Sequence, residues 1–281
     1  MLPILISFLL SAAAISTCKL NDVSSGLTTT AGIGVFILTM FLISRRVRKK
    51  VAAVQGNLQD HLEKGQRRFN RDLHQFQTKP SGSPKAMQMQ LEQKQKQMVR
   101  QALELVEQFA PLQKWSPLMG RQMNTMKLQF HYQLKEFDQV DALLAKRGFL
   151  SKPWFLEPMA VGMKMARLYA NGDIKAVHKT FKKHVKWFRG DRGTLLYALM
   201  SWVYVKQGEL KEAQLLLAKA KEKTRNEILT RNWECLANNN ENGFSNKGFG
   251  EEWYALALET PPTPKTQRQR QRGNAKGQRR F

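Results

Sequence analysis

Apolar, uncharged positions dominate the start of the chain and fall into two blocks. The second block, residues 23–44, holds no charged side chain, and about 20 such residues are enough for a helix to cross the hydrocarbon core of a membrane. A dense basic cluster follows directly, comprising Arg45, Arg46, Arg48, Lys49 and Lys50. Basic clusters of this kind stay on the cytoplasmic side of a membrane. The pattern therefore predicts an integral protein of an inner or plasma membrane, with the bulk of the chain facing the cytoplasm.

The first block has three interpretations. Residues 1–17 are a retained helix that forms a hairpin with a span at 24–44, a cleaved signal peptide, or a lipoprotein signal ending at Cys18. A signal peptide normally begins with basic residues, which are absent here, and Thr17 fits poorly before a lipoprotein cysteine. We therefore favour the hairpin. In each case the basic cluster at 45–50 closes a membrane anchor, residues 1–50, with the same orientation.

Helical periodicity continues beyond the anchor. Apolar residues from Val51 to Phe76 recur at spacings of three, four and seven, which is typical of an amphipathic helix. Residues 51–79 are thus predicted to form a stalk, to lie on the lipid surface, or to pack against the following domain. Two prolines, Pro80 and Pro84, then mark a linker at 80–84, since proline cannot continue a helix.

Residues 85–259 are predicted to form one helical domain built from repeats. Its first helix carries an apolar side that we interpret as core: Met87, Leu91, Met98, Leu105 and Phe109. Further along, a short motif recurs in which a turn is followed by an acidic residue, an apolar residue and then a small or β-branched one. The turns at Lys135, Gly172 and Gly208 lie thirty-seven and thirty-six residues apart. Each unit is a helical hairpin that buries its apolar face only against neighbouring hairpins.

The repeats resemble the tetratricopeptide family. The resemblance is clearest in the third unit, where the matching residues are Tyr204, Gly208, Leu210, Ala213, Leu217 and Ala220. The other two units match more weakly, through Gly172 in the second and Phe137 in the first. The chain departs from the family at Lys135, where glycine is usual, at Val177, where alanine is usual, and in lacking the closing proline. The resemblance implies an all-α fold, with an α-solenoid whose concave face holds a peptide or a partner helix.

Charge points to an acidic counterpart. The net charge is +24, which implies anionic lipid, nucleic acid or acidic protein as a partner. One predicted helix carries a basic stripe of Lys175, Lys179, Lys182, Lys186 and Arg189, which either binds anions or is a solvated surface. The tail at 260–281 is predicted to be disordered, and its arginines are further candidates for anion binding: Arg268, Arg270, Arg272, Arg279 and Arg280. These basic regions would alternatively fasten the domain to its own membrane.

Catalytic signatures are missing from the sequence. The five histidines lack metal-ligand spacing, and the glycine-rich loop at 238–250 lacks the Gly-Lys-Ser/Thr ending of a phosphate-binding loop. We therefore expect no enzyme activity and no cofactor. Four aromatic residues in and after this loop are expected to cap the open end of the solenoid: Phe244, Phe249, Trp253 and Tyr254. The predicted function is a membrane-anchored scaffold that binds partner proteins; the alternative is a membrane-tethered RNA- or ribosome-binding protein.

Overall fold

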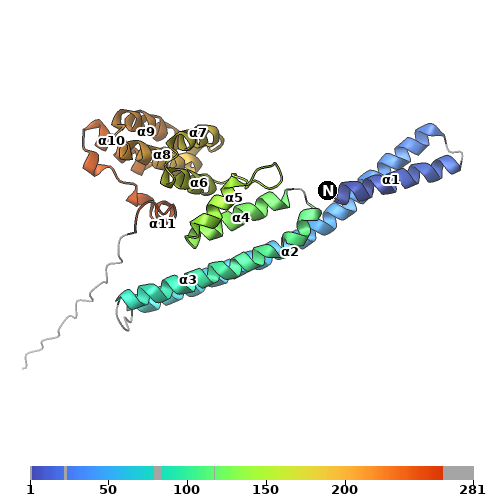
Figure 1. Ribbon diagram of the computed structural model, residues 1–281, viewed down its shortest axis with the longest axis horizontal. Helices are drawn as coiled ribbons and strands as arrows, with labels where there is room; N and C mark the ends of the chain where they lie inside the picture. The colour runs from blue at the N-terminus through green and yellow to red at the C-terminus, as the bar shows by residue number, and fades with distance from the viewer. Residues whose placement is uncertain (1, 22–23, 79–83, 117, 262–281) are drawn as a thin grey trace, which may run out of the picture.

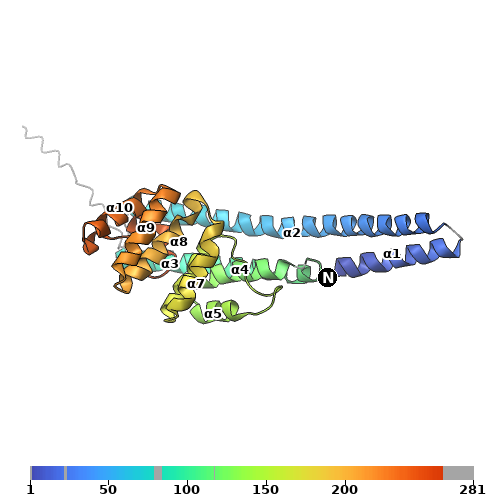
Figure 2. The ribbon, with the colours of Figure 1, turned by 90° about the horizontal axis from the view of Figure 1, so that it is seen from above.

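Every regular element of the described chain is helical (Figure 1). The computed structural model describes residues 2–21, 24–78, 84–116 and 118–261. The predicted tail, apart from its first two residues, and most of the predicted linker lie outside these ranges. Within them, an extended pair of helices at one end leads into a stack of short helices at the other, as Figure 2 also shows.

The first two helices form an antiparallel hairpin. Helix α1 spans Leu2–Leu20 and α2 begins at Ser25 and extends to Thr78. They approach closely at Gly32, where an added Cβ would lie 2.6 Å from Cγ1 of Ile15. The Ser11 hydroxyl donates a hydrogen bond of 2.8 Å to the Gly32 carbonyl. Small residues and interhelical hydrogen bonds are the usual means by which apolar helices associate.

Helix α2 is continuous from the apolar segment into the amphipathic one. Its 54 residues span about 81 Å at 1.5 Å per residue. The predicted stalk at 51–79 is not a separate helix, because α2 contains both the predicted span and the stalk. Helix α3 (Pro84–Glu107) runs back along the stalk half. Leu58 of α2 is buried together with Val99 and Phe109 in a core that continues into the next helix. Of the alternatives left open, the stalk therefore packs against the following part of the chain.

Three helical hairpins follow the stalk, after the short 3-10 helix η1 (Ala110–Lys114). They are α4 (Met119–Gln133) with α5 (Phe137–Ala145), α6 (Pro158–Ala170) with α7 (Ile174–His184), and α8 (Thr194–Lys206) with α9 (Leu210–Thr224). The 3-10 turns η2 (Val185–Trp187) and η3 (Gly190–Gly193) join α7 to α8. The first helices of the hairpins contact one another in chain order, α4 with α6 and α6 with α8.

The three predicted turns share one backbone geometry. Lys135, Gly172 and Gly208 have φ angles of 60°, 77° and 77°. In each case the next residue's N–H bonds back to a carbonyl five residues earlier, as Glu209 does to Tyr204 at 2.9 Å. This is the Schellman arrangement that ends a helix on a left-handed residue. The residue after each turn occupies the N-cap position of the following helix, and at Asp173 the side chain accepts a hydrogen bond from the Ala176 N–H.

A fourth turn of the same kind follows α10 (Glu227–Ala237). Asn239 has a φ of 53°, and the Asn240 N–H bonds to the Cys235 carbonyl at 2.8 Å. Here the second helix shrinks to the 3-10 turn η4 (Glu241–Gly243). The stack thus ends on a shortened fourth hairpin, which the sequence comparison of the turns had not included.

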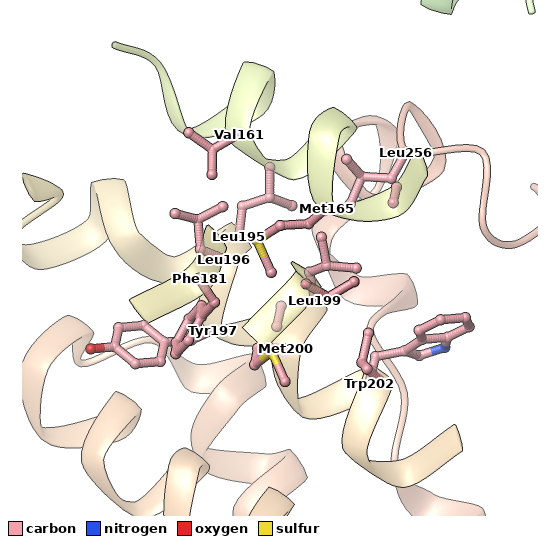
Figure 3. Close-up of a cluster of buried hydrophobic side chains, with 14 of the residues drawn as sticks. Val161, Met165, Phe181, Leu195, Leu196, Tyr197, Leu199, Met200, Trp202 and Leu256 are labelled. Carbon is pink, nitrogen blue, oxygen red and sulfur yellow. The ribbon is translucent and has the colours of Figure 1, made fainter. Parts of the chain in front are cut away.

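The main core extends from α4 to α10, and Figure 3 shows its part between α6, α7 and α8. Helix α8 is the central element, because every residue from Thr194 to Val203 is buried. Figure 3 also shows Leu256, from the end of the chain, lying over Met165 of α6. The core is therefore completed by a segment distant in sequence.

That segment contains η5 (Lys247–Phe249) and α11 (Glu251–Tyr254). Trp253 is fully buried, with its ring 5.9 Å from that of Trp202 in α8. The Glu259 carboxylate accepts hydrogen bonds from both indole N–H groups, at 2.8 and 2.9 Å. The sequence predicts that Phe244, Phe249, Trp253 and Tyr254 cap the end of the stack. Phe244, Phe249 and Tyr254 pack partly buried against the main core, whereas Trp253 contacts α8 and the following Leu256 contacts α6 and α4.

Candidate anion-binding surface

The predicted basic stripe is divided between two elements. Lys175, Lys179 and Lys182 lie on α7 and are exposed, but α7 ends at His184. Lys186 and Arg189, also exposed, belong to the 3-10 turn η2 and the extended residues after it. The predicted helix over the whole stripe was thus too long, since the backbone leaves α-helical geometry at Val185. The predicted tail arginines lie outside the described residues.

The structure brings together a second, more compact group of cations. Lys164 of α6 places its Nζ 5.0 Å from the centre of the Phe155 ring. The same ring meets the His184 ring edge-on at 5.9 Å. Lys183 and Lys152 are close enough to shift the titration of both Lys164 and His184. We call Lys152, Lys164, Lys183 and His184 the lysine cluster.

The electrostatics of this cluster are unfavourable without an added anion. Burial, followed by repulsion from Lys152 and Lys183, lowers the pKa of Lys164 to about 8. Burial, followed by repulsion from Lys164, Lys183 and Lys152, lowers the pKa of His184 to about 4. No described carboxylate forms an ion pair with any of the three lysines. A group of cations that lacks neutralising acids and stacks on an aromatic ring is suited to bind an anion.

Sequence reasoning missed Lys152, Lys164 and Lys183, because they come from a loop and two different helices. A signal was nevertheless present, since residues 174–190 contain no Asp or Glu. The usual surface mixture of both charges is therefore absent on α7. Only the tertiary arrangement adds Lys164 and Lys152 to that helix.

The repeat-packing residues occupy three kinds of position. Ala213, Leu217 and Ala220 are fully buried in the core on α9. Gly172 and Gly208 are exposed turn residues. The partly buried remainder pack against neighbouring helices: Phe137 on the Tyr132 ring at 5.4 Å, Tyr204 on His178 at 5.0 Å, and Leu210 on the main core.

Residues near the end of the described chain lie against the first helices of the three hairpins. The Tyr132 hydroxyl of α4 bonds to the Leu256 carbonyl, and the Leu256 side chain lies 3.1 Å from where a Cβ on Gly162 of α6 would be. Together with the contact of Trp253 on α8, this places residues 253–259 along the first helices of the three hairpins. The lysine cluster is formed by side chains of the α5–α6 connection, α6 and α7.

A metal centre is not formed by the described residues, among which no three His, Cys, Asp or Glu side chains lie close enough to hold an ion. The five basic residues after the apolar part of α2, Arg45 to Lys50, are all exposed. Comparison with known proteins adds no assignment: no protein-family model, no curated protein and no solved structure matches the chain.

Proposed function

We propose that the protein is a membrane-anchored adaptor whose helical-hairpin domain binds an acidic segment of a partner protein at the cytoplasmic face. The anchor is the hairpin of α1 and the first half of α2. Both helices are long and apolar enough to cross a membrane. Their large apolar side chains point outward, with Phe8 65 %, Ile37 61 % and Phe41 61 % exposed, which is costly in water and favourable in lipid.

Orientation follows from the basic residues at 45–50, which favour the cytoplasmic side. Because α2 continues without a break into the stalk, and the stalk shares a core with α4, the hairpin domain is held at a set distance from the anchor. For the architecture of the hairpin domain we propose a tetratricopeptide-like solenoid, because the spacing of its turns is close to that of such repeats. Such domains commonly act as binding platforms.

The binding part of the proposal is carried by one observation, the lysine cluster. Its positive charges repel one another in the free protein, so a bound carboxylate lowers the energy of all of them together. An acidic peptide also matches the uninterrupted positive charge along α7, which continues from Lys183 back to Lys175. The alternative face, along the first helices of the hairpins, is filled by residues 253–259.

A direct test uses the detergent-solubilised full-length protein and a fluorescent glutamate-rich peptide. Binding is followed by anisotropy for the wild type, for Lys164→Met, and for a control of equal charge change, Lys219→Met, at an exposed position of α9. We expect Lys164→Met to weaken binding several-fold and Lys219→Met to leave it nearly unchanged. Equal effects of the two substitutions would show that only net charge matters and would contradict a defined site.

A second candidate function, binding of single-stranded RNA, is favoured by Trp187. Its side chain is 71 % exposed, and Lys186 Nζ lies 5.6 Å from its ring centre. An exposed aromatic ring beside cations is suited to stack on a base. In the same anisotropy assay with an RNA oligonucleotide, Trp187→Ala would then weaken binding of RNA but not of the peptide. The affinity for RNA would also fall steeply with salt.

A further inference from the structure

The connection between α5 and α6, residues 146–157, exposes an apolar tip. Phe149 is 73 % and Leu150 42 % exposed, although both are large hydrophobic side chains. They follow Gly148, whose φ of 100° turns the chain at this point. Exposed apolar groups gathered at one loop tip indicate a surface that is covered in the functional state.

Basic residues surround this tip, without acidic ones. Lys146, Arg147 and Lys152 flank it in sequence, and the stretch from 142 to 156 has no Asp or Glu. Arg121 of α4 adds a fourth cation, with its guanidinium carbon 5.0 Å from the centres of both the Phe149 and Trp154 rings. An apolar tip within a ring of cations matches the surface of a bilayer that contains anionic lipids.

The loop is held firmly against the beginning of α4. Asn124 donates a hydrogen bond of 2.6 Å to the Ser151 carbonyl, and Arg121 donates one of 3.2 Å to that of Lys152. Thr125 is bonded to both the N–H and the carbonyl of Trp154. The Leu150 carbonyl lies 3.0 Å from where a Cβ on Gly120 would be. The position of the tip is therefore set by the first two turns of α4.

The beginning of α4 lies beside the start of α1 and the end of the apolar part of α2. A small cavity of about 190 Å³ is lined by Trp115 and Ser116, which precede α4, together with Pro3 and Ile4 of α1 and Ser44 and Arg48 of α2. Trp115 thus lies level with the start of α1 and with the basic cluster, where tryptophan is favoured in membrane proteins. Figure 1 shows the α5–α6 connection on the side of α4 that faces the α1 and α2 hairpin.

From this arrangement we infer that the α5–α6 connection is a second contact with the bilayer spanned by α1 and α2. Phe149 and Leu150 enter the headgroup region of this bilayer. Arg121, Arg147 and Lys152 bind its anionic headgroups. This inference rests on the proposed membrane anchor. It adds that the hairpin domain docks on the membrane surface rather than standing away from it. The stalk alone does not require such docking.

The test uses the full-length chain in lipid nanodiscs, with Cys18→Ala and Cys235→Ala removing both native thiols. An environment-sensitive fluorophore is attached at Phe149→Cys, at Leu38→Cys within the apolar part of α2, or at Leu215→Cys on α9. The control positions are matched by exposure, at 59 % each. Nitroxide lipids, labelled near the headgroup or deep in the acyl chain, then report the depth of each fluorophore. Discs of phosphatidylcholine alone and with phosphatidylserine are compared.

We expect the fluorophore at 149 to shift to the blue and to be quenched most by the shallow nitroxide, more strongly in the discs with phosphatidylserine. The fluorophore at 38 should be quenched by the deep nitroxide, and that at 215 by neither. Quenching at 38 with none at 149 would overturn the second contact and leave the anchor intact. Absence of quenching at 38 would overturn the anchor, and the second contact with it.

A double substitution tests whether the loop binds lipid headgroups or only lies near the membrane. Arg147→Gln with Lys152→Gln removes two of the cations and leaves the apolar tip and the bonds of the loop backbone in place. In discs with phosphatidylserine, we expect this pair to reduce the quenching at 149 toward the value in phosphatidylcholine alone. Unchanged quenching would mean that the headgroups are not bound by these side chains, and would overturn that part of the inference.

Discussion

The side-chain hydroxyl of Tyr132 donates a hydrogen bond of 2.5 Å to the backbone carbonyl of Leu256, 124 residues further along the chain. Both residues are buried, and burial raises the pKa of Tyr132, so its hydroxyl remains a donor. The bond joins the first hairpin to the segment that closes the stack. Residues 253–259 are thereby part of the fold rather than an extension of it.

Removing this bond should destabilise the domain. Tyr132→Phe leaves the Leu256 carbonyl buried without its partner, which typically costs about 1–3 kcal/mol. Thermal unfolding of the detergent-solubilised protein, followed by circular dichroism, measures the change. Tyr254→Phe at the same segment is the control, because no hydrogen bond of its hydroxyl is recorded in the structure. Equal melting temperatures for the two variants would show that this hydrogen bond contributes nothing to stability.

Truncating Leu256 to alanine tests the same contact through packing. Leu256 is fully buried, and a change of this kind in a core costs roughly 2–5 kcal/mol. Leu258, partly buried in the same segment, supplies the matched comparison, and its alanine variant should lose less. Chemical denaturation monitored by tryptophan fluorescence is suited to the measurement, since Trp202 and Trp253 lie in this region. A larger loss at Leu258 would contradict the arrangement.

Substitutions at two of the turns should change the stability of the domain in opposite directions. Lys135 has a φ of 60°, a conformation that costs a residue with a Cβ roughly 1 kcal/mol relative to glycine. Lys135→Gly should therefore stabilise the domain, and Gly172→Ala, at a φ of 77° with no atom within 4 Å of the added Cβ, should destabilise it by a similar amount. The melting temperature should rise for the first and fall for the second. A fall for Lys135→Gly with a rise for Gly172→Ala would contradict this prediction and would mean that the added freedom of glycine in the unfolded chain outweighs the strain.

A bidentate ion pair joins the first two hairpins. Arg167 of α6 bonds to both carboxylate oxygens of Asp141 on α5, and this bonding holds the pKa of Asp141 below its usual value. Because the folded-state pKa is lowered, the stability from this pair is present above the unfolded pKa of about 4 and is lost as the pH falls through the folded value. Asp141→Asn should cost about 1 kcal/mol at neutral pH. Asp60→Asn at the exposed pair with Lys64 should cost about 0.5 kcal/mol or less.

The difference between Asp141→Asn and the wild type should shrink when unfolding is repeated at successively lower pH. At a pH below both pKa values the carboxyl is protonated in the folded and the unfolded chain, so the two proteins should unfold together. A difference that stays constant to low pH would show that the loss comes from packing and not from the charge of Asp141.

The lysine cluster predicts a different pH dependence. The pKa of Lys164 is about 8 in the folded chain and about 10.5 in the unfolded chain, so the unfolded chain binds more protons between these values and stability rises with pH across that window. Lys164→Met should therefore stabilise the protein at pH 7 and flatten the rise between about 8 and 10.5. Lys219→Met should do neither. Binding of the acidic peptide should weaken in the wild type as the pH rises through about 8.

The periodicity of the chain was sufficient to predict helices and the three turns, because both depend on residues close in sequence. A turn residue with positive φ, such as Gly172 or Gly208, ends one helix and places the next acidic residue at the N-cap position of the following helix. The continuous α2 was missed because a helix has no local reason to break between an apolar and an amphipathic stretch. The end of α7 was predicted too late. The helical spacing of apolar residues continues through Phe188, whereas the α-helical backbone ends at His184.

The sequence by itself determined the two apolar segments with their basic flank, the helical hairpins and the excess of positive charge, since each is a property of neighbouring residues. Only the tertiary structure decided that Leu256 lies against Tyr132, that Lys152 and Lys183 gather around Lys164, and that Phe149 lies at the same end of α4 as Trp115. The physical reason is that these contacts depend on the complementarity of packed surfaces, which joins residues far apart in the chain. No local pattern encodes that pairing.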